Sequence, residues 1–283
     1  MQIATTIQET KAFVRDARSA HQRVGLVPTM GALHAGHLSL VRAAKAQTDA
    51  VLVSIFVNPL QFGPKEDLNK YPRTFEHDCA LLEKEGVDFV FAPSVAEMNP
   101  PPGAITYVQV GGLSDRLDGV SRPGHFRGVT TVVAKLFHIV EPDRAFFGQK
   151  DAAQCAIIRR MVRDLNFAVE IVVCPIVREP DGLAMSSRNA YLNAEERRQS
   201  LVLSRALRRI EQVFAAGERD AAKLLAAGRE LLATVPAVRL DYLSVVDPDS
   251  LEPVREVQHP TLVALAAWVG STRLIDNVLL SPR

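Results

Sequence analysis

Two histidines three residues apart are the side chains of this chain best suited to chemistry. His34 and His37 flank Ala35-Gly36, where the apolar run 24–27 gives way to a helical pattern from His37 onward. Unpaired backbone N–H groups and the positive end of the helix dipole gather at such a start, so a phosphate is favoured there. Imidazole adds a proton-exchanging group near neutral pH. The pattern therefore indicates a phosphate-binding turn with both rings on one side.

Two other interpretations of these histidines have to be weighed. Either ring could merely cap the helix or satisfy a hydrogen bond in the core. A His-x-x-His pair also resembles a pair of metal ligands, but no third histidine or cysteine ligand lies nearby in the sequence. The cysteines Cys79, Cys155 and Cys174 form no paired spacing either. Phosphate binding is the interpretation that the spacing favours.

A second candidate segment, residues 178–189, lies between two differently patterned halves of the chain. Ser186 and Ser187 offer hydroxyl donors, and the planar guanidinium of Arg188 can hold phosphate oxygens. The preceding Pro180-Asp181-Gly182 is a turn that could act as a hinge. The segment could also be a solvated linker with an incidental arginine. Together with the histidine turn, it favours a mobile anion clamp.

Alternating strand and helix patterns must position these groups. The nearly unbroken β-branched run 51–57 is typical of a strand covered on both faces, as in parallel sheets. Repeated β-α-β units predict an α/β fold with a doubly wound parallel sheet of the Rossmann-like kind. The other elements expected here are helices at 75–85, 129–140 and 151–165, and strands at 87–91, 145–147 and 169–173.

Polar residues follow several of these strands. Doubly wound sheets bind ligands beyond the carboxyl ends of their strands, so the loops at those ends are the places to inspect. Loops are polar in general, and chance therefore remains an alternative for any single one of them. The loops expected to converge on this rim are 30–37, 58–62, 148–151 and 178–188.

The pattern changes near residue 190. Residues 194–232 are helical in pattern, with Gly217 between two helices, and three strands follow at 238–246, 261–269 and 272–280. Short connections make these strands antiparallel, which indicates a separate unit. We therefore expect a Rossmann-like catalytic domain at 1–182 and a smaller C-terminal α+β domain with an antiparallel sheet, a lid, at 183–283.

Composition narrows the partners. The 283 residues carry 33 basic and 32 acidic side chains, a net charge of +1, which argues against nucleic acid as a partner. Three scattered cysteines fit a reducing cytoplasm. The N-terminus lacks a secretory signal, and the apolar run 261–271 is about half the length that a bilayer requires. We expect a soluble cytoplasmic protein with no membrane partner.

The two segments also carry a family resemblance. His34-Ala35-Gly36-His37 resembles the HxGH signature of the nucleotidylyl transferase superfamily, and Met185-Ser186-Ser187-Arg188 resembles its later KMSKS-type loop. Within that superfamily the chain is similar to the pantoate–β-alanine ligase family. Further blocks that carry this similarity are 28–33, 56–62, 71–74, 124–129, 146–151, Gln154 and 181–189.

The resemblance implies an ATP site and two substrate sites. His34, His37, Lys150 and Arg188 would be catalytic, with His37 as a proton donor and Asp151 on the ribose. Gln61 and Gln154 would bind pantoate, and Gln61 would also bind β-alanine. The implied ATP-binding residues are Met30, Gly31, Ala32, Leu33, His34, Ala35, Gly36, His37, Gly148, Gln149, Lys150, Asp151, Val177, Met185, Ser186, Ser187 and Arg188.

The implied reaction condenses pantoate and β-alanine to pantothenate through pantoyl adenylate, with release of AMP and pyrophosphate. Magnesium would accompany ATP, no tightly bound organic cofactor is implied, and the family implies a homodimer. At 77–78, where we expect an acidic pair in the family, this chain has His77-Asp78. Asp78 is therefore the single candidate protein ligand for the metal.

Two rival functions remain open at this point. Another adenylyl- or cytidylyltransferase could share the motifs, although Gln61 and Gln154 favour a hydroxylated carboxylate substrate. A noncatalytic nucleotide-binding module is the other, although the intact His34, His37, Lys150 and Arg188 speak against it. Ala184 and Ser187 replace the lysines of the synthetase-type loop, which argues against a tRNA synthetase.

Overall fold

The computed structural model describes residues 1–283 except 65, 100–102, 104 and 283. Among the described residues, six parallel strands form one sheet in the order β1-β4-β3-β2-β5-β6. The chain order reverses between β2 and β5, so the crevice of this doubly wound sheet opens beyond their carboxyl ends. The strands are β1 (Gln2–Ala4), β2 (Val24–Thr29), β3 (Ala50–Ile55), β4 (Phe89–Phe91), β5 (Arg144–Gly148) and β6 (Glu170–Cys174).

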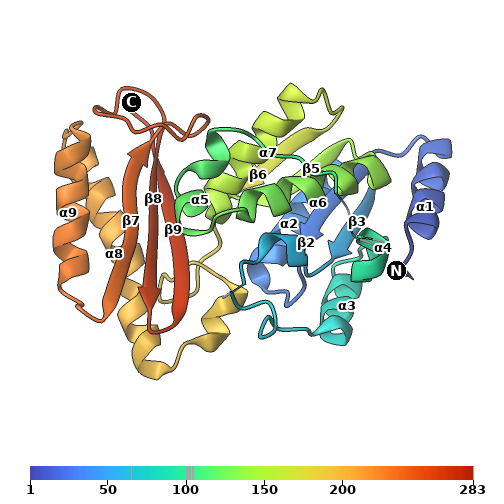
Figure 1. The fold of residues 1–283 in the computed structure, drawn as a ribbon, viewed down its shortest axis with the longest axis horizontal. Coiled ribbons are helices and arrows are strands. Elements are labelled where there is room, and N and C mark those ends of the chain that lie inside the picture. The colour runs from blue at the N-terminus through green and yellow to red at the C-terminus, as the bar shows by residue number, and fades with distance from the viewer. Residues whose placement is uncertain (65, 100–102, 104, 283) are drawn as a thin grey trace.

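Helices cover both faces of this sheet, as Figure 1 shows. The helices of this part are α1 (Ile7–Ser19), α2 (Ala35–Gln47), α3 (Phe75–Lys84), α4 (Val95–Met98), α5 (Asp118–Ser121), α6 (His125–Val140) and α7 (Ala152–Asp164). Short 3₁₀ turns lie between them and after them, namely η1 (Pro59–Gln61), η2 (Leu113–Asp115), η3 (Gln149–Asp151) and η4 (Ser187–Tyr191).

Strand side chains alternate between two hydrophobic clusters. Leu26 and Leu52 belong to the cluster formed with α1, α6 and α7, whereas their neighbours Val27 and Val53 belong to the one formed with α2 and Leu82. Successive side chains of a strand point to opposite faces, so a strand buried on both faces is apolar throughout. The expectation drawn from the run 51–57 is confirmed. No helix among the described residues has the length and apolar character to cross a bilayer.

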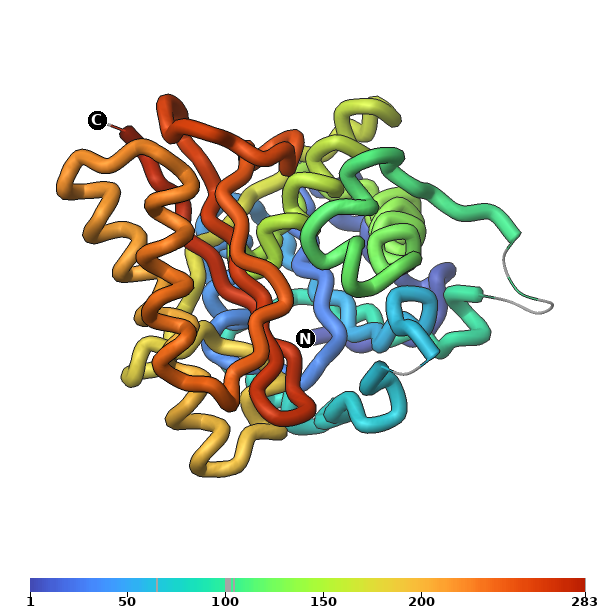
Figure 2. The backbone as a smooth tube through the Cα atoms, turned by 60° about the vertical axis from the view of Figure 1, so that its left-hand side comes forward, coloured from blue at the N-terminus to red at the C-terminus, as the bar shows by residue number. Residues whose placement is uncertain are grey.

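The C-terminal part, as far as it is described, is a three-stranded antiparallel sheet, β7-β8-β9, with two helices packed on it. Figure 2 shows from a second side that these strands lie alongside the parallel-sheet part. A hydrophobic cluster that begins at Leu183 forms its core. The domain boundary at 182/183 stays a prediction. The elements are α8 (Ala194–Ala215), α9 (Ala221–Ala233), β7 (Val238–Val246), β8 (Thr261–Val269) and β9 (Thr272–Leu280).

Some expected elements differ from the observed ones. α2 begins at Ala35 rather than His37, because the side chain of His34 caps it, and α6 begins at His125 rather than at 129. β1 and α1 were missed, although Thr6 and Glu9 form a capping box that the sequence displays. β1 has three residues and pairs with β4, which is far away in the chain, so local pattern carries little signal for it.

Candidate active site

The turn after β2 is held by a buried carboxylate. Gly31 and Ala32 both have positive φ angles, 79° and 50°, so the chain reverses sharply after the strand. Asp78 of α3 is fully buried, and its two oxygens accept hydrogen bonds from the backbone N–H groups of Ala32 and Leu33, each at 2.9 Å. The Thr74 hydroxyl donates a third, at 3.1 Å. Asp78 therefore fixes the shape of the turn that carries the histidines.

These bonds bear on the predicted magnesium ligand. Both carboxylate oxygens of Asp78 are engaged by the protein, and the described residues hold no group of three or more His, Cys, Asp or Glu side chains that could bind a metal ion. The observed role of Asp78 is structural. The sequence-based expectation that it binds magnesium is a separate matter, which the magnesium requirement of Asp78→Asn can test.

The two histidines orient each other through the helix start. His34 is the N-cap of α2, and its Nδ1 accepts from the Gly36 N–H at 3.1 Å. The His37 Nδ1 accepts from the His34 N–H at 3.3 Å, and the ring centroids lie 4.1 Å apart. A Cβ at Gly36 would come within 2.9 Å of the His34 ring. Packing therefore explains the glycine at position 36, because a larger side chain there would collide with the His34 ring that caps the helix.

Burial keeps both rings uncharged at neutral pH. Mainly through desolvation, the pKa of His34 is lowered to about 4 and the pKa of His37 to about 3, and the nearby positive charge of Lys150 lowers both further. Because each Nδ1 accepts a backbone hydrogen bond, the proton of each neutral ring is on Nε2. The pair therefore offers two neutral N–H donors to an anion.

The later segment folds into a tight hairpin that reaches this turn. The Met185 N–H donates to the Val177 carbonyl at 3.0 Å, and the Gly182 φ of 96° closes the turn between them. The side chain of Ser186 caps η4, and the Ser187 hydroxyl donates to the Ala32 carbonyl at 3.1 Å. The structure thus brings the two motif segments into direct contact, although the bonded residues are 155 positions apart in the chain.

Arg188 is oriented by a carboxylate from a third loop. Its Nε and Nη2 donate to the two oxygens of Asp67 at 2.8 and 2.9 Å, a bidentate pair that fixes the plane of the guanidinium. The Tyr71 ring centroid lies 5.9 Å from the guanidinium carbon. Asp67 therefore acts as an orienting partner for the arginine that the sequence singled out.

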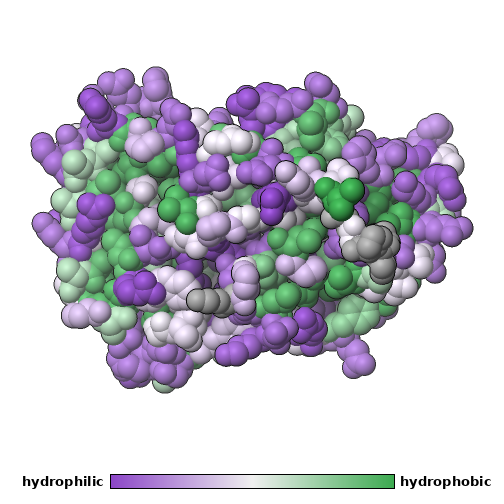
Figure 3. All heavy atoms as spheres, in the orientation of Figure 1, coloured by the Kyte–Doolittle hydropathy of each residue, from purple (hydrophilic) through white to green (hydrophobic). Residues whose placement is uncertain are grey.

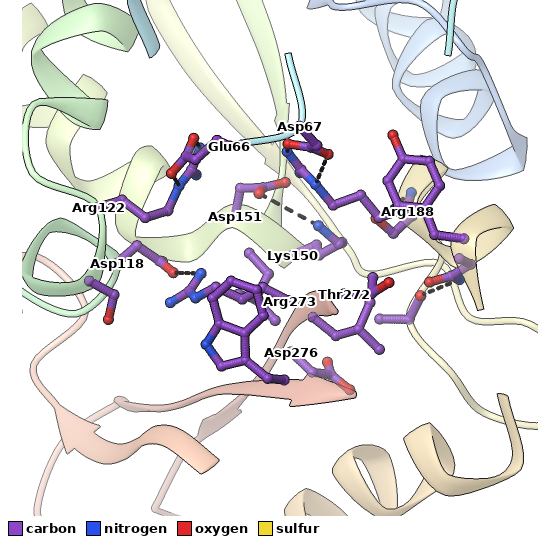
Figure 4. A pocket seen from close by; sticks show the side chains of 18 of the residues that line it. Glu66, Asp67, Asp118, Arg122, Lys150, Asp151, Arg188, Thr272, Arg273 and Asp276 are labelled. Atoms are coloured by element: carbon purple, nitrogen blue, oxygen red, sulfur yellow. Dashed lines mark hydrogen bonds and ion pairs between the residues drawn. The ribbon is translucent and has the colours of Figure 1, made fainter. Parts of the chain in front are cut away.

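A cavity of about 830 Å³ lies between the parallel sheet and the C-terminal sheet. Figure 4 shows Lys150 and Arg188 on its wall, with Arg273 and Asp276 facing them from β9. The Lys150 Nζ lies 3.6 Å from the Asp151 carboxylate. The predicted site residues that line this cavity are Lys150, Asp151, Gln154, Ser186 and Arg188. The histidine turn is not part of this lining, and Ser187, which lies between the lining residues Ser186 and Arg188, bonds to Ala32 of that turn.

Gln61 lies beside this cavity, in the loop after β3. Its side chain accepts from the Asn58 amide at 3.1 Å and donates to the Met30 sulfur at 3.1 Å. α6 packs closely against this turn, because a Cβ at Gly128 would come within 2.1 Å of the Leu60 carbonyl oxygen. The turn that carries Gln61 is therefore held by the helix behind it.

Sequence reasoning missed the ionic partners in this site. Glu66 forms a bidentate pair with Arg122, with both oxygens at 2.7 Å, next to the Asp67–Arg188 pair. His125 contacts the Gln61 carbonyl at 2.8 Å, and burial lowers its pKa to about 4. The available signal was the position of His125 within a block that resembles the family.

The fold and this site define a class of protein. A doubly wound sheet whose polar loops meet beyond the carboxyl ends of its strands, at the switch point, is typical of nucleotide-binding enzymes. The family model described as pantoate-beta-alanine ligase matches residues 2–279. The chain belongs to the pantoate-beta-alanine ligase family.

Relatives and solved structures agree with this membership. A pantothenate synthetase of Acidobacterium capsulatum is 66% identical, and the match covers 99% of this chain and 97% of the relative. The crystal structure of pantothenate synthetase from Thermus thermophilus is similar with a TM-score of 0.95 at 48% identity, covering 100% of both chains. A pantoate-beta-alanine ligase from Francisella tularensis, complexed with beta-gamma ATP and beta-alanine, has a TM-score of 0.81 at 34% identity, covering 99% of this chain and 97% of that one.

The lowered pKa values predict a pH dependence of stability. Between about pH 6.5 and the folded pKa of about 3, an unfolded His37 binds a proton that the folded protein excludes, so the free energy of unfolding falls as the pH falls. His37→Gln should remove up to about 1.4 kcal/mol per pH unit from this dependence. Urea denaturation at about pH 7 and pH 5 measures it.

The control is His259→Gln, at a solvent-exposed histidine. Equal pH dependence in the wild type and in His37→Gln would contradict the neutral state of the half-buried His37.

Proposed function

We propose that this chain joins pantoate to β-alanine in an ATP-dependent reaction that passes through pantoyl adenylate. The observation that carries the proposal is the contact between the histidine turn and the Ser-Ser-Arg segment, made by Ser187 and Ala32, with the charge of Lys150 close to both histidines. Family membership and the ATP and β-alanine complex of the Francisella relative support the substrates.

In the first step, a carboxylate oxygen of pantoate attacks the α-phosphorus of ATP. The bond from that phosphorus to the bridging oxygen breaks, and pyrophosphate leaves. Negative charge gathers on the α-phosphoryl oxygens and the pyrophosphate, so preorganised donors stabilise this transition state. The proposed donors are the Nε2–H groups of His34 and His37, the Lys150 ammonium and the Arg188 guanidinium.

In the second step, the amine of β-alanine attacks the acyl carbon of the adenylate. The bond to the AMP oxygen breaks, and the new amide nitrogen gives up its proton to water. No covalent enzyme intermediate is required. Gln61 and Gln154 would orient pantoate, and holding the reactants together contributes up to about 7–11 kcal/mol.

The direct test follows AMP in purified protein given ATP, magnesium, pantoate and β-alanine. AMP should form only when both organic substrates are present, and pantothenate should form in equal amount. His37→Ala should lower kcat by roughly 10²-fold or more, because a preorganised donor to developing charge is lost. AMP release without either organic substrate would overturn the proposed reaction. A near-normal rate in His37→Ala would overturn the role given to His37.

Magnesium enters this proposal together with ATP, held by phosphate oxygens and water, where it would neutralise phosphate charge.

Because an amide has one acceptor oxygen where Asp78 has two, Asp78→Asn should lower the free energy of unfolding by about 1–3 kcal/mol. The magnesium concentration for half-maximal rate should stay within about twofold of the wild type. Asp16→Asn, at an exposed position, is the control. A large rise in the magnesium requirement with unchanged stability would instead make Asp78 a metal ligand.

The family resemblance implies a homodimer, and two exposed apolar side chains are candidates for its interface. Ile105 and Tyr107, two residues apart in the chain, are 94% and 59% exposed. Figure 3 shows hydrophobic areas among hydrophilic ones on one face of the molecule. Light scattering should give twice the mass of one chain, and a persistent monomer would contradict the dimer.

A cytoplasmic location completes the proposal. Cys79, Cys155 and Cys174 are free, as expected for a reducing compartment. An oxidised cysteine pair in the chain isolated from cells would contradict this location.

A further inference from the structure

A buried amide on β9 is bonded to the loop that carries Lys150. Asn277 is 3% exposed, and its Nδ2 donates to the Gln149 carbonyl at 2.8 Å and to the Lys150 carbonyl at 3.0 Å. Its Oδ1 accepts from the Gln149 side chain at 3.2 Å. One side chain of the C-terminal sheet thus makes three hydrogen bonds to η3.

Among the described residues, side-chain caps do not hold η3, and the local bond from a side chain is that of the Cys155 thiol to the Gly148 carbonyl, at 3.4 Å. η3 has three residues, and within the described chain neither its N-cap Gly148 nor the N-cap Asp151 of α7 makes a side-chain capping bond. The direction of the Lys150 side chain follows from its backbone, which Asn277 holds by direct hydrogen bonds from β9. Lys150 also lies close enough to lower the pKa of both histidines. A shift of this backbone would therefore move the charge at the proposed phosphate site.

The neighbouring residue on β9 holds the other motif segment. Asp276 pairs with Arg178 through two bonds of 2.7 and 2.9 Å, and Arg178 also donates to the Gly182 carbonyl at 3.2 Å. The Asn277 N–H donates to the same carboxylate at 2.8 Å. The two adjacent side chains therefore connect β9 to both loops of the proposed ATP site.

We propose that Asn277 is a positioning residue, which acts on the reaction by holding the backbone of Lys150. The inference rests on the proposed function, because it takes Lys150 as a donor to the phosphates of ATP. Asn277 contacts no reacting atom in this scheme. Its effect on the rate must therefore pass through Lys150 and vanish when the ammonium is absent.

A double-mutant cycle tests this dependence. Asn277→Ala in the wild type should lower kcat/KM for ATP by roughly tenfold or more, with the KM for pantoate changed less than about twofold. In the Lys150→Ala background, the same change should cost less than about twofold, since residues that act as a unit are not additive. Leu279→Ala, at an exposed position on β9, is the control.

Equal losses from Asn277→Ala in both backgrounds would overturn the inference, as would a loss confined to the KM for pantoate. If Asn277→Ala does not fold, the same double-mutant cycle is run with Asn277→Ser, which retains one hydroxyl donor. That cycle then tests the role of Asn277 by the same criteria. The wild-type AMP assay separates the two proposals. A wild type without the two-substrate requirement contradicts the function, whereas an active wild type with an additive cycle contradicts only the role of Asn277.

Discussion

The pairing of backbone N–H groups in the turn after β2 is the constraint on which the site depends. Buried N–H groups need acceptors, and this turn obtains them from side chains. Asp78 accepts from Ala32 and Leu33, His37 accepts from His34, and His34 accepts from Gly36. Each acceptor is oriented by the bond that it makes. The same bonds that satisfy the backbone therefore place both Nε2–H groups.

Three arginines at or next to the cavity are paired with carboxylates from other segments. Arg188 pairs with Asp67, Arg122 with Glu66, and Arg178 with Asp276. Because Glu66 and Asp67 are adjacent, one short stretch of chain contacts both Arg122 and Arg188. A bidentate pair restricts the guanidinium to one plane, so orientation is set before a ligand arrives. Donors fixed in this way stabilise the negative charge that develops on phosphate oxygens in the transition state.

Periodicity predicted much of the fold because burial follows it directly. The three C-terminal strands lie where expected, since each is bounded by a turn and contributes apolar side chains to the core of the C-terminal part. α2 and α6 begin earlier than expected, because capping and turn geometry, rather than hydrophobic spacing, set a helix start. β1 escaped prediction because its pairing with β4 is not local.

By itself the sequence determined the histidine turn at a helix start, the alternation of strands and helices, and the residue types available for catalysis, since all of these follow from local order. Only the tertiary structure decided which carboxylate holds Arg188, that Asp78 supports a turn, and that Asn277 reaches the Lys150 loop. These contacts join segments far apart in the chain. Their partners are chosen by packing of the two sheets against each other, which no local pattern records.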